Sequence, residues 1–185
     1  PMLERMSEGI PLRLDYDYLL NRTTLRAARL LVFTGPIDEY FNNCLGRLTY
    51  RGQMRETRYV RDRDWLMPCV QINEPGPECP TIRTIEWKHM MRSEDARRIR
   101  GTVITSETPF TPTDSDGYEY PFPDNHNRTL YRQYRALAER ESGVLFCGRL
   151  GEYRYYDMDQ AIARALKLAH RISKGMMNEP VVQSI

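Results

Sequence analysis

The chain has 185 residues, a formal net charge of +2 and 41% hydrophobic residues. This length suits one domain or a tight pair, and the composition is that of a globular protein, which argues against disorder. No apolar run approaches the roughly 20 residues of a membrane helix, and no apolar segment follows a basic start as it does in a secretory signal. We therefore expect a cytoplasmic protein that does not bind a membrane.

The basic residues are almost all arginine, since three are lysine and 24 are arginine. The planar guanidinium suits phosphate and carboxylate recognition, although most surface arginines are simply solvated. They are interleaved with 25 acidic residues, which argues against an arginine-rich nucleic-acid binder. The cysteines have no CxxC spacing, so we interpret them as small buried thiols in a reducing compartment: Cys44, Cys69, Cys79 and Cys147.

Short elements are expected over the first 46 residues. Helical spacing covers 2–6, and the alternation of Leu12, Leu14 and Tyr16 with polar residues predicts a short half-buried strand. A loop or short helix is expected over 21–28. An apolar strand within 29–34, with Leu30 to Phe33 at its centre, is broken by Gly35 and Pro36, and Pro36 opens a helical turn over 37–41.

The middle of the chain has the pattern of an antiparallel sheet. Period-two stretches are separated by turn residues, which predicts several short strands in succession. These stretches are Leu48/Tyr50, Thr57/Tyr59, Met67/Cys69/Gln71, Ile82/Thr84/Glu86 and Val103 to Thr105. The segment from Thr108 to Asp124 is rich in Pro, Thr, Asp and Gly and is expected to be an irregular surface loop.

The C-terminal part is the most regular. Asp124 is a candidate cap for a helix that carries Leu130, Tyr134, Leu137 and Ala138 on one face. A buried strand from Val144 to Cys147 and a glycine-containing turn follow. A second helix begins near Asp157 or Asp159, ends near Lys174, and has an apolar stripe of Ile162, Ala165, Leu166, Ala169 and Ile172. This order is typical of the end of an α/β nucleotide-binding domain.

The stretch from Gly148 to Asp159 is the strongest candidate site, because it joins a buried strand to a helix. Such a loop can present side chains and helix amides to an anion, with Arg149 and Tyr155 as contacts. The alternative is a packed loop with core tyrosines and aspartate caps. Arg83, in an apparent strand between isoleucines, faces either a cleft or solvent, and the Tyr118–Pro121 segment is a third candidate or a stiff turn.

Several signals of other sites are missing. The chain contains neither a GxGxxG nor a GxxxxGK[ST] phosphate-binding motif. Its histidines, His89, His126 and His170, have no metal-ligand spacing, so no metal site is expected.

Five motifs occur together in one order. They are Thr34-Gly35-Pro36-Ile37-Asp38, Gly46-Arg47-Leu48-Thr49-Tyr50-Arg51, Arg83 with Glu86 and Lys88, Tyr120-Pro121, and the stretch Gly148-Arg149-Leu150-Gly151 with Tyr153-Arg154-Tyr155-Tyr156-Asp157-Met158-Asp159. In order and spacing this set resembles the UDP-galactopyranose mutases over roughly 1–168. The resemblance implies a flavoenzyme that interconverts UDP-galactopyranose and UDP-galactofuranose, with N5 of reduced FAD as the nucleophile on the anomeric carbon. Such enzymes serve cell-envelope polysaccharide biosynthesis.

The resemblance also implies roles for individual residues. Arg83 and Asp157 correspond to groups near the reacting sugar and flavin, and Arg83, Tyr120 and Tyr155 to groups that bind the diphosphate. Gly148, Arg149, Met158 and Asp157 correspond to flavin contacts. The chain departs from the usual bacterial pattern in having Thr81-Ile82 before Arg83 and Trp87 between Glu86 and Lys88.

The fold class expected from the pattern and the resemblance is α+β, with an antiparallel substrate-domain sheet and the closing strand and C-terminal helix of an FAD-binding α/β domain. Residues 1–46 hold a strand within or bordering the FAD domain, 47–123 the substrate-binding sheet and loop, 124–175 the helix-strand-helix return, and 176–185 a tail. The family's N-terminal glycine motif for FAD is missing. We therefore expect the isolated chain to be inactive, to need the missing N-terminal half as partner, and to form a homo-oligomer.

Alternatives are a non-catalytic UDP-sugar-binding or assembly module derived from that family, and another member of the broader flavin amine-oxidase-like group.

Overall fold

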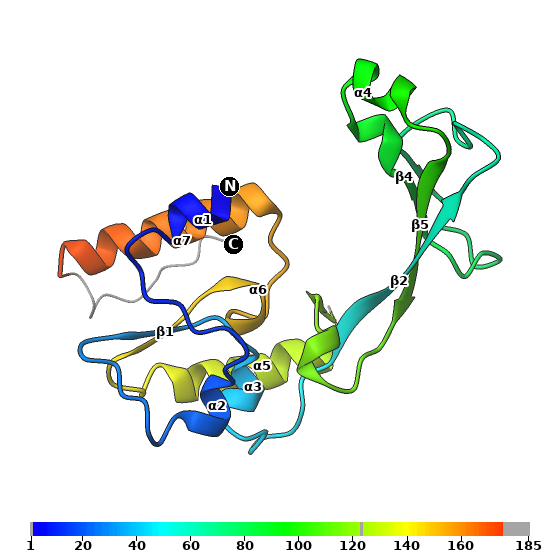
Figure 1. Ribbon diagram of the computed structural model, residues 1–185. Helices are drawn as coiled ribbons and strands as arrows, with labels where there is room; N and C mark the ends of the chain where they lie inside the picture. The colour runs from blue at the N-terminus through cyan, green and yellow to red at the C-terminus, as the bar shows by residue number, and fades with distance from the viewer. Residues whose placement is uncertain (1, 123, 176–185) are drawn as a thin grey trace.

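The computed structural model describes residues 2–122 and 124–175 (Figure 1). The predicted tail, 176–185, lies outside the described residues. The elements in chain order are α1 (Met2–Met6), α2 (Tyr18–Asn21), β1 (Leu31–Phe33), α3 (Ile37–Tyr40), β2 (Tyr50–Val60), β3 (Gln71–Asn73), β4 (Arg83–Glu86), the 3-10 helix η1 (Trp87–Met90), α4 (Ser93–Arg98), β5 (Thr102–Phe110), the 3-10 helix η2 (Ser115–Gly117), β6 (Tyr120–Pro121), α5 (Asn125–Ala138), β7 (Val144–Phe146), α6 (Gly148–Gly151) and α7 (Met158–Ser173).

Two sheets organise these elements. β1 and β7 form a parallel pair, and the other strands form an antiparallel sheet in the order β3-β4-β5-β2-β6. Figure 1 shows β2, β4 and β5 extending away from the helices, with α4 at the far end. We call residues 53–110 the sheet arm and the remaining described residues the body. The mixed α+β class predicted from the sequence is confirmed.

The body is centred on a buried, largely aromatic cluster. Its buried members come from α3, the segment before β2, β2 itself, α5 and the loop after α6: Ile37, Leu48, Tyr50, Leu130, Tyr134 and Tyr153. The α5 helix begins where the Asp124 carboxylate accepts the Asn127 backbone N–H, at 2.6 Å. The cap fixes the start of the helix, and Leu130 and Tyr134 then lie one helical turn apart on the same face. Both side chains therefore reach the core, as the sequence predicts.

The sheet arm differs from the sequence prediction in three places. β2 is one continuous strand and not two stretches, while Met67 and Cys69 lie in the connection before β3. β5 runs on to Phe110, and β6 pairs with the start of β2, so the expected loop over 108–124 is partly sheet. These strands are rich in polar residues, so they lack a clear apolar alternation. Their formation depends on pairing with strands that are far away in sequence, which the local pattern does not show.

One other prediction is wrong, and one is confirmed with an unexpected exposed face. No strand forms at Leu12, Leu14 and Tyr16, whose side chains are exposed, because alternation alone makes no strand without a partner to complete its hydrogen bonds. The α7 helix forms as predicted, but the buried side chain is Leu168, whereas Ile162 and Leu166 of the predicted apolar stripe are 56% and 66% exposed.

The expectation of four buried cysteines also fails. Cys147 is buried, but Cys44 and Cys69 are exposed and Cys79 is intermediate; all four are free thiols.

Candidate functional site

Arg149 lies at the centre of a cluster of aromatic rings between the body and the base of the sheet arm. The Tyr120 and Tyr155 rings stack at 5.5 Å between centroids, and the Arg149 guanidinium carbon lies 4.7 Å and 5.1 Å from these two centroids. Arg149 Nη1 donates to the Glu119 carbonyl at 3.0 Å and Nη2 to the Tyr156 carbonyl at 2.6 Å. Cation–π and hydrogen-bond contacts thus hold the guanidinium in one orientation.

Tyr155 and Asp157 continue this cluster to the start of α7. The Tyr155 hydroxyl donates to Asp157 Oδ1 at 3.0 Å, and this hydrogen bond, with the charge of Asp157, raises the pKa of Tyr155. Asp157 is also the N-cap of α7 in a capping box, in which its own N–H donates to Gln160 Oε1 at 3.1 Å. Met158 follows and is 79% exposed. Asp157 therefore combines the predicted capping position with contact to a candidate site tyrosine.

The tyrosines of this loop divide into two groups. Tyr153 and Tyr156 are buried, as the packed-loop alternative predicts, and Tyr155 is exposed. Tyr153 has a φ of +42° and its hydroxyl lies 3.2 Å from the Phe122 carbonyl, which ties the loop to the end of β6. Burial raises the pKa of Tyr153, so its hydroxyl stays protonated as a structural donor. Of the three, Tyr155 alone is available to a ligand.

The two glycines beside Arg149 have separate structural reasons. Gly148 has a φ of +84°, a conformation that other residues adopt only with strain. A side chain on Gly151 would lie 3.0 Å from the Phe33 carbonyl, so α6 packs directly on the end of β1. The Gly-Arg-Leu-Gly sequence thus places Arg149 at the carboxyl end of the parallel pair.

Arg83 lies on β4, in the same cross-strand row as Glu107 of β5 and Arg55 of β2. Arg83 Nη1 bonds Glu107 Oε2 at 3.1 Å, and Arg55 Nε bonds Glu107 Oε1 at 3.1 Å. The Glu107 side chain is 5% exposed, whereas that of Arg83 is 36% exposed. The Arg83 Nε is buried without a hydrogen-bond partner. Ile85 shares the face of Arg83, because the two are two residues apart on one strand.

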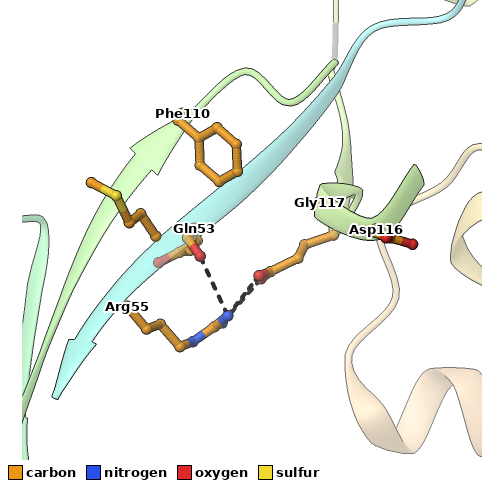
Figure 2. A pocket seen from close by; sticks show the side chains of 7 residues that line it. Gln53, Arg55, Phe110, Asp116 and Gly117 are labelled. Carbon is orange, nitrogen blue, oxygen red and sulfur yellow. Dashed lines mark hydrogen bonds and ion pairs between the residues drawn. The ribbon is translucent and has the colours of Figure 1, made fainter. Parts of the chain in front are cut away.

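A second carboxylate joins this row to the Arg149 cluster. Arg55 forms a bidentate pair with Glu119, at 2.7 Å and 3.1 Å, and the carbonyl of Glu119 accepts from Arg149. Figure 2 shows Arg55 beside a pocket of about 410 Å³, whose other lining residues are Gln53, Met54, Phe110, Asp116, Gly117 and Glu119. The hydrogen bonds that Arg55 donates to Glu119, with the charges of Glu119 and Glu107, raise the pKa of Arg55, so it stays charged.

The sequence-predicted site residues are therefore brought together in two linked groups. Arg149, Tyr120, Tyr155 and Asp157 form one cluster, with Gly148 and Met158 at its edges, and Arg83 is connected to it through a chain of contacts. Sequence reasoning missed Glu107, Arg55 and Glu119. No local signal marks them, because each becomes distinctive only through a partner more than 20 residues away.

Other motif residues stabilise the fold. Buried Asp38 accepts from the Leu48 N–H and the Tyr50 hydroxyl, both at 2.9 Å, and burial raises its pKa. Glu86 and Lys88 are buried at the far end of the sheet arm, where the Lys88 ammonium donates to three carbonyls. Trp87, between them, donates from Nε1 to the Thr105 hydroxyl at 2.6 Å.

Across 2–122 and 124–175, no group of three or more His, Cys, Asp or Glu side chains could hold a metal ion. Within the same ranges no helix has the length and apolar character needed to cross a membrane.

Comparison with known proteins identifies the family. The family model described as UDP-galactopyranose mutase matches residues 1–155. The chain belongs to the UDP-galactopyranose mutase family. Among curated relatives, a probable UDP-galactopyranose mutase of Klebsiella pneumoniae is 32% identical over 80% of this chain and 37% of its own length. The UDP-galactopyranose mutase of Mycoplasma pneumoniae is 34% identical over 77% of this chain and 36% of its own length.

The relatives differ in substrate name and are longer than the part that this chain matches. A dTDP-fucopyranose mutase of Escherichia coli is 30% identical over 74% of this chain and 35% of its own length, so the similarity extends to a second nucleotide sugar. The chain spans just over a third of the length of these mutases. The family is therefore established by sequence.

Proposed function

We propose that this chain supplies the antiparallel-sheet side of the site of a flavin-dependent mutase that interconverts UDP-galactopyranose and UDP-galactofuranose. The observation that carries the proposal is the convergence of Arg149, Tyr120 and Tyr155, linked to Arg83. The guanidinium of Arg83 and the phenol groups of Tyr120 and Tyr155 suit a diphosphate, because the guanidinium offers fixed positive charge and directed N–H donors.

The residues present also fit a flavin. Arg149 is held against aromatic rings, exposed Met158 begins α7, and both lie next to the strand end at which nucleotide cofactors bind in open α/β sheets. Arg149, Gly148, Met158 and Asp157 would hold the cofactor's ring system. When bound and reduced, it would supply the nucleophile for the anomeric carbon.

The chain's own side chains would act on charge and orientation. Arg83 has a buried Nε without a partner and an outer guanidinium edge that is partly exposed, so it can pair with a diphosphate as negative charge develops on departing UDP. Tyr120 and Tyr155 would donate hydroxyl hydrogen bonds to diphosphate oxygens. The single Tyr155 hydroxyl proton is donated to Asp157 Oδ1 at 3.0 Å, so Tyr155 would exchange this bond for one to the diphosphate when the substrate binds.

We further propose that the isolated chain neither binds FAD tightly nor turns over. The β1–β7 pair is two-stranded, and such pairs are marginally stable unless further strands or helices cover them. The apolar side chains Met158, Ile162 and Leu166 form an exposed stripe on α7. We infer that further chain of a complete mutase packs on this stripe, and that a homo-oligomer forms when that chain is absent.

A titration tests the proposal. UDP added to the purified chain in a calorimeter should bind weakly, and inorganic pyrophosphate should compete with it. Flavin absorbance after dialysis against FAD should show far less than one FAD per chain, and chromatography should detect no UDP-galactofuranose. Absence of both UDP and pyrophosphate binding would contradict the diphosphate site, whereas stoichiometric FAD or turnover would contradict the need for further chain.

A second candidate is the same reaction on a dTDP-6-deoxysugar, which the similarity to the E. coli dTDP-fucopyranose mutase favours. Parallel titrations with UDP and dTDP distinguish the two, since tighter binding of dTDP would support the second. A third outcome would support a non-catalytic binding module. In that case the chain, joined to a complete flavin domain, would still bind UDP but would show no turnover.

A further inference from the structure

Four charged side chains alternate in sign across the base of the sheet arm. Their order is Arg83, Glu107, Arg55 and Glu119, each ion-paired with the next. The formal charges cancel, so the loss of any one member leaves the row with a net charge. Glu107 is the buried member, and its two oxygens are divided between the two arginines.

We propose that Arg55 is a positioning residue that keeps Arg83 available to the diphosphate. A buried carboxylate and a guanidinium form a bidentate pair when nothing else occupies the second oxygen. Arg55 occupies Oε1 of Glu107, so Arg83 shares one N–H with Oε2 and keeps its remaining Nη donors for a ligand, whereas its Nε is buried. This inference rests on the proposed function, since it concerns the same anion site.

Arg55 is itself fixed on its outer side. Glu119 holds both Nη atoms of Arg55, and the carbonyl of Glu119 accepts from Arg149, which lies over the Tyr120 ring. Arg55 therefore links the sheet row to the loop that carries the second half of the site. Without Arg55, Glu107 and Glu119 would leave a net negative charge beside the anion site, which disfavours diphosphate binding.

Arg55→Met tests the proposal, because methionine keeps most of the apolar length and removes the charge. We expect the UDP affinity of the chain to fall about tenfold, the loss typical of one charge-assisted interaction. Arg58→Met is the matched control, since Arg58 is an exposed arginine three residues along β2, on the opposite face. It should leave UDP affinity within about twofold of wild type, as surface substitutions usually do.

A double variant separates this role from a merely structural one. Glu107→Gln in the Arg55→Met background removes the carboxylate that would capture Arg83, so UDP affinity should recover to within about threefold of wild type. If Arg55 only stabilised the fold, the second substitution would lower affinity further. Arg55→Lys keeps the positive charge near Glu107 and should lose little affinity.

The NMR signal of the Arg83 Nε–H group gives a readout that needs no ligand. This group is buried, so its proton should exchange slowly. The signal should shift in Arg55→Met and stay in place in Arg58→Met. Glu119→Gln removes the outer partner of Arg55 but keeps the charge of Arg55, so it should shift the Arg83 signal less than Arg55→Met does. This variant replaces Arg55→Met in the test if Arg55→Met does not fold.

The two readouts distinguish the two proposals. If wild type does not bind UDP but the Arg83 signal follows the predicted order, the proposed function is wrong for the isolated chain and the coupling of Arg55 to Arg83 is supported. If UDP binds and neither the signal nor the affinity responds to Arg55→Met, or if the double variant binds more weakly than Arg55→Met, the positioning role is overturned.

Discussion

The body and the sheet arm are stabilised by different interactions. In the body, side chains from α3, β2, α5 and the loop after α6 form one aromatic cluster in which Ile37, Tyr50 and Tyr134 are almost completely buried. In the sheet arm the buried side chains include Glu86, Lys88 and Glu107, while Met54 and Trp65 are exposed. Apolar burial dominates in the body, whereas the arm adds buried charges to a small apolar core of Ile85, Ala96 and Ile104.

This difference matters for the site, because Arg83, Glu107 and Arg55 belong to the arm and Arg149 and Tyr155 to the body. Buried charges contribute little net stability but are costly to break, since removal of one partner leaves the other uncompensated. The geometry of the site therefore depends on polar contacts in the arm and on packing in the body.

The largest effect is expected at Tyr134 in the body. Tyr134→Ala removes a fully buried ring and should lower the free energy of unfolding by about 3–5 kcal/mol. Tyr134→Phe keeps the ring but loses the hydroxyl, which donates to the Gly46 carbonyl and accepts from the Leu45 N–H, and should cost about 1–2 kcal/mol. Urea denaturation measures both, and equal losses in the two variants would contradict a core held by ring burial.

Lys88→Met should affect the arm selectively. The substitution leaves the carbonyls of Asp64, Ile99 and Gly101 without their shared donor, at a cost of roughly 2–3 kcal/mol. Hydrogen exchange should accelerate in β4 and β5 and stay unchanged in α5. Lys167→Met, at an exposed lysine of α7, is the control and should change neither region. Faster exchange throughout the molecule would mean that body and arm unfold as one unit.

A smaller effect follows from the pH response of Glu86. Burial would raise its pKa, but hydrogen bonds from the Thr102 hydroxyl and the Met67 and Leu66 N–H groups, with the charge of His89, lower it below the ordinary 4.5. Just below pH 4.5 the unfolded chain therefore binds more protons than the folded one, and stability is lost as pH falls through the lowered pKa.

Glu86→Gln tests this response. The free energy of unfolding, measured from pH 6 downwards, should fall less steeply below pH 4.5 in the variant than in wild type. Parallel curves for the two proteins would show that other groups, and not Glu86, control the acid response of the arm.

The body could be predicted from the sequence far better than the arm. The α5 and α7 helices carry local signals, since Asp124 and Asp157 cap them and apolar residues recur at helical spacing. The arm has few such signals: β2 is largely polar, and its strand partner is about 50 residues away. Glu107 and Arg55 could not be predicted for the same reason. Arg149 and Arg83 were candidates from their places after a buried strand and within an apparent strand, and the family resemblance gave them roles.

The smallest effect is expected on the exposed face of α7, which carries Ile162 and Leu166 of the predicted apolar stripe. Leu166→Gln should change the free energy of unfolding by less than about 0.5 kcal/mol, because its side chain is 66% exposed. Leu168→Gln, two residues along the same helix, buries a polar amide beside the core and should cost about 2 kcal/mol or more. Light scattering then compares self-association in the wild type and in Leu166→Gln. If the exposed stripe on α7 drives association in solution, Leu166→Gln should reduce self-association without loss of stability. Equal destabilisation by both substitutions would mean that the stripe is already covered in the isolated chain.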